Sequence, residues 1–323
     1  MMTLRVSSVF KDELLKYRDI QLASGIKLVS IERQLNYFDD FIRENNVESI
    51  YFDHDLAIKW LNYRKEQGPA TRYIRLLWSY HFLIYLKSLG YDVYIPRLPR
   101  HIDNKFQAYI FSDKEIYDYF EKIDSYYSAH DPFVALYLPV IFRILYTSGT
   151  RIGETLSLKV KDVDLENGIL AMSETKNGKE RYVVVSEDVK KLLNMYADKC
   201  LYLKKKDDFF FSHLDKRRVT EQSIYLFHRK ALNDAGITYI GRGNGPRLHD
   251  LRHTFAVKSL IKLEKEGYDI NNILPVLSKY LGHSKISSTE RYIKLVSAHF
   301  DDIIDKTSSI TRTLVKGETD EDN

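Results

Sequence analysis

The second half of the chain carries a spaced series of basic and nucleophilic side chains that could together cleave a phosphodiester. In chain order they are Arg151, Lys176, His249, Arg252, His283 and Tyr292. Guanidinium and imidazole groups can neutralise the charge that spreads over the non-bridging phosphate oxygens in a transition state. A lysine can protonate a departing alkoxide, and a tyrosine can attack phosphorus and hold the phosphate covalently. Because side chains supply the positive charge, this chemistry needs no metal ion.

Taken singly, the first members of the series also have ordinary structural interpretations. Arg151 and Glu154 are three residues apart, a spacing typical of a surface ion pair that contributes less than about 1 kcal/mol. His249 and His253 are four residues apart and could face one metal ion from a helix. Asp250, however, stands where zinc proteases with that spacing carry a glutamate, and nothing nearby suggests a third ligand. The alternative is that His249 and an arginine three residues later face one anion.

The last two members are also common structural residues. Leu281-Gly282-His283 could end a helix, and Tyr292 is one of 24 tyrosines, most of which we expect to be half-buried core residues. The complete set in this order indicates more than any single member, because the series supplies phosphate ligands, an acid, a base and a nucleophile.

At these residues the sequence resembles the tyrosine recombinase family, also called the phage integrase family. The resemblance covers about residues 112–295 in order and spacing, and the chain is most similar to simple two-domain members of the chromosome-dimer-resolving or transposon-borne kind. The matching stretches are Thr147 to Glu154 (TSGTRIGE), Leu248 to Ala256 (LHDLRHTFA), Leu281 to Ser284 (LGHS) and Thr289 to Tyr292 (TERY).

The resemblance implies a role for each residue of the series. Tyr292 would attack the scissile phosphate, form a 3′-phosphotyrosyl link and free a 5′-hydroxyl. Arg151 and Arg252 would clamp the phosphate, and His283 would also donate to it. His249 would take the proton from the tyrosine. The phosphotyrosyl link stores the bond energy, so neither ATP nor another cofactor is expected.

The resemblance further implies a general acid and the partners of the reaction. Lys176 would protonate the leaving oxygen, with Lys179 as its rival on the same turn, and Glu154 would support the site. The expected partner is double-stranded DNA with inverted-repeat half-sites, bound by a tetramer of the protein and possible accessory proteins. Two alternatives stay open: a type IB topoisomerase-like enzyme that relaxes DNA, and a non-catalytic DNA-binding regulator.

The elements that position these residues predict two domains in a mainly α protein with a small antiparallel β-sheet (α+β). Helical periodicity with stops such as Gly90 runs through residues 1–100, which resemble the family's core-binding domain. A linker at 101–111 follows, and Ser112 with Glu115 forms a capping-box pattern that opens a catalytic domain at 112–304. Strand-like runs at 169–172 and 182–185 flank Asn177-Gly178, a strong hairpin signal. The tail at 305–323 is expected to be partly disordered.

Charge is concentrated in the first domain although the net charge is only +4. The window 59–105 holds nine Lys or Arg and three acidic residues, which gives a local charge of +6. Such a stretch is typical of phosphate contacts, although a solvated helix face would look the same. The residues predicted to contact DNA are Arg72, Arg75, Lys87 and Arg247.

Composition excludes several other classes of protein. Hydrophobic residues make up 44% and charged residues 29% of the 323, which excludes a wholly disordered chain. No apolar run approaches the ~20 residues that cross a bilayer, so no membrane partner is expected. The single cysteine, Cys200, suits a reducing compartment, and the predicted location is the cytoplasm.

Overall fold

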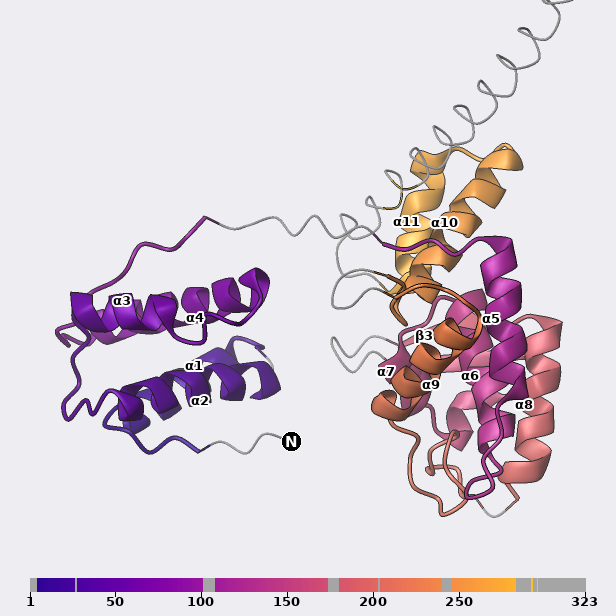
Figure 1. Ribbon diagram of the computed structural model, residues 1–323, viewed down its shortest axis with the longest axis horizontal. Coiled ribbons are helices and arrows are strands. Elements are labelled where there is room, and N and C mark those ends of the chain that lie inside the picture. The colour runs from indigo at the N-terminus through magenta and orange to yellow at the C-terminus, as the bar shows by residue number, and fades with distance from the viewer. Residues whose placement is uncertain are drawn as a thin grey trace, which may run out of the picture. The chain divides into compact units, whose positions relative to one another are not determined.

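A computed structural model describes residues 5–26, 28–100, 108–173, 180–202, 204–239 and 245–282, together with Tyr292 and Leu295. The chain divides into two compact units, Met1–Lys105 and Phe106–Asn323. The boundary falls within the segment 101–111 that the sequence predicts as a linker. Figure 1 shows the helices and strands of the two units.

Four helices pack around a cluster of aromatic rings in the described part of the N-terminal unit. The ring of Phe38 lies 5.8 Å from Phe52, 5.4 Å from Trp60 and 5.3 Å from Phe82, measured between centroids. Helical spacing in the sequence predicts one apolar face within residues 31–42. This is confirmed, because its five members are all buried: Ile31, Leu35, Phe38, Phe41 and Ile42. The helices are α1 (Lys11–Ala23), α2 (Leu28–Glu44), α3 (His54–Asn62) and α4 (Pro69–Ser88).

The ends of α3 and α4 follow local sequence signals. Asp53 caps α3 by accepting a hydrogen bond from the backbone N–H of Leu56 over 2.8 Å. Pro69 occupies the first turn of α4, where its missing N–H costs nothing. After α4 the chain turns at Gly90, whose φ of +89° favours glycine.

The buried face of α4 differs from the predicted one. Helical spacing predicts a stripe made of Tyr73, Leu76, Leu77, Tyr80, Leu83 and Ile84. Leu76 and Leu83 are buried, but Ile84 is 41% exposed. The helix instead buries a face that includes Arg75 and Trp78. The prediction placed the stripe about one residue too late, because α4 is apolar over much of its circumference and periodicity alone does not determine its rotation.

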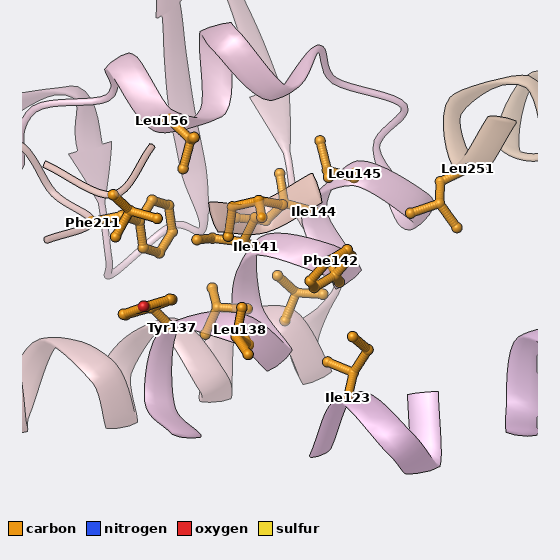
Figure 2. Packing of buried hydrophobic residues seen from close by; sticks show 14 of the residues in the cluster. Ile123, Tyr137, Leu138, Ile141, Phe142, Ile144, Leu145, Leu156, Phe211 and Leu251 are labelled. Carbon is orange, nitrogen blue, oxygen red and sulfur yellow. The ribbon is translucent and has the colours of Figure 1, made fainter. Parts of the chain in front are cut away.

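Helix α6 (Val134–Thr147) is the centre of the C-terminal unit. It is apolar on nearly every side, which is typical of a helix surrounded by other elements. Figure 2 shows Ile141 and Phe142 of α6 among side chains from several other segments, including Leu156 and Phe211. The remaining helices of this unit are α5 (Asp113–Ser125), α7 (Ile152–Ser157), α8 (Glu187–Cys200), α9 (Glu221–Asp234), α10 (Asp250–Lys265) and α11 (Ile270–Leu281), with a 3-10 turn η1 (Val160–Asp162).

Three short strands form an antiparallel sheet in the order β1 (Val163–Asp164), β2 (Ile169–Ser173) and β3 (Glu180–Val184). The β2–β3 register pairs Ser173 with Glu180, so the predicted Asn177-Gly178 turn falls in the connection between paired strands. Along β3 the side chains alternate: Val183 is buried, whereas Tyr182 and Val184 are 68% and 64% exposed. This alternation directs Arg181 toward the interior.

The predicted fold class is confirmed: the unit that follows the linker is mainly helical and contains a small antiparallel sheet. The Ser112–Glu115 capping box is also confirmed at the start of α5. No helix among the described residues is long and apolar enough to span a bilayer. The tail at 305–323 lies outside the described residues.

Candidate active site

Arg151 lies in the turn between α6 and α7, where it is the N-cap residue of α7. Its Nη1 donates to the Glu154 carboxylate over 2.6 Å, and its Nη2 donates to the carbonyl of Gly282 over 2.7 Å. The turn depends on Gly149, whose φ is +59° and whose Cβ, if present, would lie 2.4 Å from a ring carbon of Phe255. The residues just before Arg151 therefore shape the backbone that presents its guanidinium.

Arg252 lies in the first turn of α10 and is only 1% exposed. Its Nη1 donates to the carbonyl of Gly149 over 2.6 Å, and its Nη2 donates to the carbonyl of Leu281 over 2.8 Å. Burial lowers the pKa of Arg252 to about 10, and the nearby charge of Arg151 acts in the same direction. Both arginines are thus tied to the end of α11, where Gly282 has a φ of +66°.

Glu154 joins Arg151 to a third arginine, Arg181, that is not among the residues predicted from the sequence. Glu154 is 8% exposed, and its Oε2 accepts a hydrogen bond from Arg181 Nη2 over 2.7 Å. Burial, the largest influence, raises the pKa of Glu154, but the hydrogen bonds from Arg181 and then Arg151 hold it below the ordinary value. The ordinary interpretation of a surface ion pair does not fit, because the carboxylate is buried between two cations. An arginine at an inward position of β3 is the signal that could have identified Arg181.

The hydroxyl of Tyr292 lies 3.0 Å from Nδ1 of His253, and Tyr292 is 1% exposed. The ring of His249 packs edge-on against His253, with centroids 4.8 Å apart. On the other side of the His253 ring, Nε2 lies 4.0 Å from Oδ1 of Asp250, which is within ion-pair distance but too long for a hydrogen bond. From the sequence, the metal alternative was the one role predicted for His253, because a contact across 39 residues leaves no local signal.

These groups together present a strongly cationic, largely buried site. Arg151, Arg181 and Arg252 contribute three positive charges, and Glu154 is the carboxylate that bridges two of them. An excess of fixed guanidiniums in a site of low dielectric favours an anion with several oxygens, such as a phosphodiester. Tyr292 is close enough to raise the pKa of Arg252, against the larger lowering by burial. A buried phenol and a cluster of guanidiniums that could bind such an anion therefore occur in one unit.

Comparison with known proteins decides the family. Residues 118–299, more than half of the chain, match the sequence profile of the phage integrase family. The chain belongs to this family. It is therefore a relative of the tyrosine recombinases, as the motifs around Arg151, His249 and Tyr292 predicted.

Known relatives match different lengths of this chain. The protein y4rB of Sinorhizobium fredii is 27% identical over 323 residues, which cover 88% of this chain and 93% of that protein. The tyrosine recombinase XerA of Saccharolobus solfataricus is 35% identical over 157 residues, or 49% of this chain and 45% of that protein. The chain thus spans about half the length of several curated relatives that it matches.

Solved structures agree on the fold of the family. The XerH site-specific recombinase bound to a palindromic difH substrate aligns with a TM-score of 0.66 and 20% identity, over 86% of this chain and 79% of that one. The Tn1549 transposon integrase in complex with a circular intermediate DNA aligns with a TM-score of 0.62 and 17% identity, over 92% of this chain and all of that one. At these identities the likeness supports the fold.

The four basic residues predicted to contact DNA differ in their exposure and in their contacts. Arg75 does not fit the prediction: it is 1% exposed, donates to the carbonyl of Tyr63 and lies over the ring of Trp60 at 4.7 Å. Its guanidinium is buried because it lies on the packed face of α4, and burial lowers its pKa to about 10. Lys87 is exposed near the end of α4.

Arg72 and Arg247 each line a cleft. The cleft beside Arg72, of about 660 Å³, is formed by α3, the start of α4 and residues 97–100, and it also contains Lys65, Arg97 and Arg100. Arg247 lines a cleft of about 490 Å³ that also contains His249. The side chain of Arg247 is 42% exposed and lies 3.6 Å from the Asp250 carboxylate.

Three predicted residues cannot be placed. Lys176, its rival Lys179 and His283 lie outside the described residues, so their roles stay predictions. The metal alternative concerned His249 and His253. Within the described part of the chain there is no group of three or more His, Cys, Asp or Glu residues that could hold a metal ion.

Proposed function

We propose that this protein is a site-specific DNA recombinase in which Tyr292 forms a 3′-phosphotyrosyl intermediate without metal or ATP. The observation that carries the proposal is the assembly of Arg151 and Arg252, 101 positions apart in the chain, at the end of α11, within electrostatic reach of Tyr292. Because both guanidiniums donate to neighbouring backbone carbonyls, their orientation is fixed before DNA arrives. Pre-oriented donors stabilise a transition state without reorganisation.

Each step of the proposed reaction conserves the number of phosphoester bonds. The phenolic oxygen of Tyr292 attacks phosphorus, its proton passes to an imidazole, and the bond to the 5′ oxygen breaks as Lys176 donates a proton to it. Arg151, Arg252 and His283 bind the non-bridging oxygens. Rejoining reverses these transfers with the 5′-hydroxyl of a second strand as the nucleophile, so no external energy source is needed.

Two imidazoles compete for the role of the base. The family resemblance assigns it to His249, whereas His253 is the imidazole whose contact with the Tyr292 hydroxyl, at 3.0 Å, is seen directly. Asp250 lies on the far side of the His253 ring, an arrangement in which a carboxylate can orient an imidazole base. The rate of cleavage, measured against pH in His249→Ala and His253→Ala variants, identifies which histidine is the base. In the variant that lacks the base, the rate no longer shows the pH dependence caused by titration of that imidazole.

The proposed substrate is double-stranded DNA with inverted-repeat half-sites, bound by a tetramer. Support comes from solved structures of similar fold, which include a lambda integrase tetramer bound to a Holliday junction. In the N-terminal unit the cleft beside Arg72 supplies four cations for phosphate contacts, Lys65, Arg72, Arg97 and Arg100. Accessory proteins and a cytoplasmic location stay predictions.

The proposal is tested with a nicked duplex that carries the inverted repeats flanking the gene. We expect the wild-type protein to become covalently attached to this substrate, and the Tyr292→Phe variant to bind it with similar affinity but to form no adduct. An adduct formed by Tyr292→Phe would refute the assignment of the nucleophile. Covalent attachment and DNA relaxation without strand exchange would favour the topoisomerase-like alternative. Binding by the wild type without any adduct would favour a regulator.

A further inference from the structure

The interior of the phosphate site contains a charge that neither the motifs nor the proposed steps use. Arg181 projects inward from β3, its side chain is 12% exposed, and its Nη2 donates to Glu154 over 2.7 Å. Its Nε and Nη1 are buried and have no partner among the residues that the structure describes. Buried guanidinium groups with unpaired donors are costly, so stability alone does not account for an arginine here.

We propose that Arg181 is a positioning residue of the phosphate site, which acts through Glu154 to fix the orientation and the available charge of Arg151. This proposal rests on the proposed function and adds a component to its site. Two hydrogen bonds connect the two arginines through Glu154. Arg181 Nη2 donates to Glu154 Oε2, and Arg151 Nη1 donates to Glu154 Oε1 over 2.6 Å.

Glu154 contacts Arg151 at both its backbone and its side chain. Its Oε2 accepts from the backbone N–H of Arg151 over 3.2 Å, while its Oε1 accepts from the Arg151 side chain. One carboxylate thus holds both ends of Arg151. Arg181 donates to Oε2 as well, so the plane of the carboxylate, and with it the guanidinium of Arg151, has a defined orientation.

The charge balance points to the same role. Arg151 and Glu154 alone would form a neutral pair, and a neutral pair attracts a phosphodiester weakly. With Arg181 the group of three carries a net charge of +1, to which Arg252 adds another, so the site keeps two positive charges for the anion. Arg181 therefore compensates the carboxylate that positions Arg151.

Arg181 also keeps that carboxylate ionised. Burial raises the pKa of Glu154, and the hydrogen bond from Arg181 is the largest influence that lowers it, ahead of the one from Arg151. Among the described residues, the other charged groups near this carboxylate are Arg252 on α10 and, beside the adjacent Gly153, Glu221 at the start of α9. Without Arg181 the pKa of Glu154 rises, and protonation then releases Arg151 at a higher pH than in the wild type.

The first test measures the rate of covalent attachment at saturating DNA for Arg181→Met, Glu154→Gln and the double variant. Misplacement of one phosphate ligand is expected to slow attachment by about 100-fold in each single variant. Because both changes break the same connection, the double variant is expected to be no slower than the slower single variant. Multiplication of the two losses, to about 10⁴-fold, would overturn the proposal, since Arg181 would then act independently of Glu154.

Two further readouts exclude a merely structural role. The acidic limb of the rate against pH is expected to move to higher pH in Arg181→Met and to be absent in Glu154→Gln. Arg181→Lys, which keeps the charge, is expected to recover part of the rate. Arg218→Met is the matched control, because Arg218 also donates to α7, at Leu156 and Ser157, but not to Glu154. An equal slowing by Arg218→Met would mean that any loosening of α7 has this effect, which would refute the specific role.

A direct contact between Arg181 and DNA is the rival outcome. It would weaken DNA binding and reduce the slope of log affinity against log salt by about 1, whereas a positioning residue leaves that slope unchanged. A change of the slope in Arg181→Met would therefore overturn the proposal.

A measurement without DNA separates failure of this proposal from failure of the proposed function. In the full-length protein the side-chain ¹⁵Nε signal of Arg151, assigned with Arg151→Lys, is expected to exchange slowly with water and to broaden in Arg181→Met. If the signal is unchanged, Arg181 does not position Arg151, whatever the protein does to DNA. If the signal responds but the wild type never attaches to DNA, the connection exists and the recombinase proposal fails.

Discussion

Replacing Arg252 by methionine separates the catalytic use of a buried cation from its effect on stability. Burial lowers the pKa of Arg252 well below the ordinary value for arginine, to about 10, so keeping the cation in the folded state costs about 3 kcal/mol at neutral pH. This cost is present in full at every pH below about 10 and diminishes as the pH rises from there toward the ordinary pKa of arginine, because the folded state favours the neutral form. Methionine removes the cost and fills a similar volume.

The substitution also removes two hydrogen bonds. The carbonyls of Gly149 and Leu281 lose their donors, at about 1–3 kcal/mol each if no other group replaces Arg252. Set against the relief of about 3 kcal/mol, the net loss of unfolding free energy is expected to be no more than about 3 kcal/mol. In a domain of this size that lowers the melting temperature by at most roughly 12 °C, and the protein stays folded at 25 °C.

The effect on DNA cleavage is expected to be much larger. Removing one pre-oriented donor from a transition state commonly costs 10²–10³-fold, and Arg252 supplies a full charge as well, so we expect a loss on the order of 10³-fold or more. The assay is the rate of covalent trapping at saturating nicked duplex, with thermal unfolding followed by circular dichroism on the same samples. Cleavage by folded Arg252→Met within about 10-fold of wild type would refute the phosphate clamp.

Arg75 offers a matched control for this experiment. It is equally buried and burial lowers its pKa to the same value, but it lies in the N-terminal unit against Trp60. Arg75→Met is expected to change the melting temperature by a similar amount and to leave the cleavage rate at saturating DNA unchanged. If it slows cleavage as much as Arg252→Met does, general destabilisation explains both losses.

Three further outcomes are expected. EDTA should leave cleavage unchanged, and activity lost in EDTA and restored by zinc would revive the metal alternative for His249 and His253. Gly149→Ala should destabilise the protein by about 1–2 kcal/mol and slow cleavage, because its Cβ would collide with Phe255. Adding Phe255→Leu should restore part of the stability and part of the cleavage rate. Wild-type stability and cleavage in Gly149→Ala would contradict the described turn. Arg72→Gln should reduce the slope of log affinity against log salt by about 1, and an unchanged slope would exclude a phosphate contact there.

Much of the fold could be predicted from the sequence because its signals are local. Asp53 and the Ser112–Glu115 pair bond to backbone groups within three residues, so the helix starts they mark need no distant contact. The apolar run at about 133–146 forms α6, and because it is apolar on nearly every side, its burial does not depend on the rotation of the helix about its axis. The two strands that flank Asn177-Gly178 pair antiparallel, as expected for strand-like runs on either side of a hairpin signal.

The chemistry of the site was likewise visible in residue types and spacing, which placed Arg151, His249, Arg252 and Tyr292 in one series. The sequence alone thus predicted the family, the fold class and two arginines of the proposed phosphate site, Arg151 and Arg252, but not Arg181. It could not determine which cations lie on the surface: Arg75 belongs to a basic window, yet its guanidinium is buried.

The tertiary structure alone decided the contacts between side chains that are distant in the chain. Arg181 meets Glu154 across 27 residues, and His253 meets Tyr292 across 39. Such contacts depend on how a strand is registered and how a helix is rotated about its axis. Burial of apolar surface over the whole unit sets both, whereas the neighbours in sequence favour several registers and rotations almost equally.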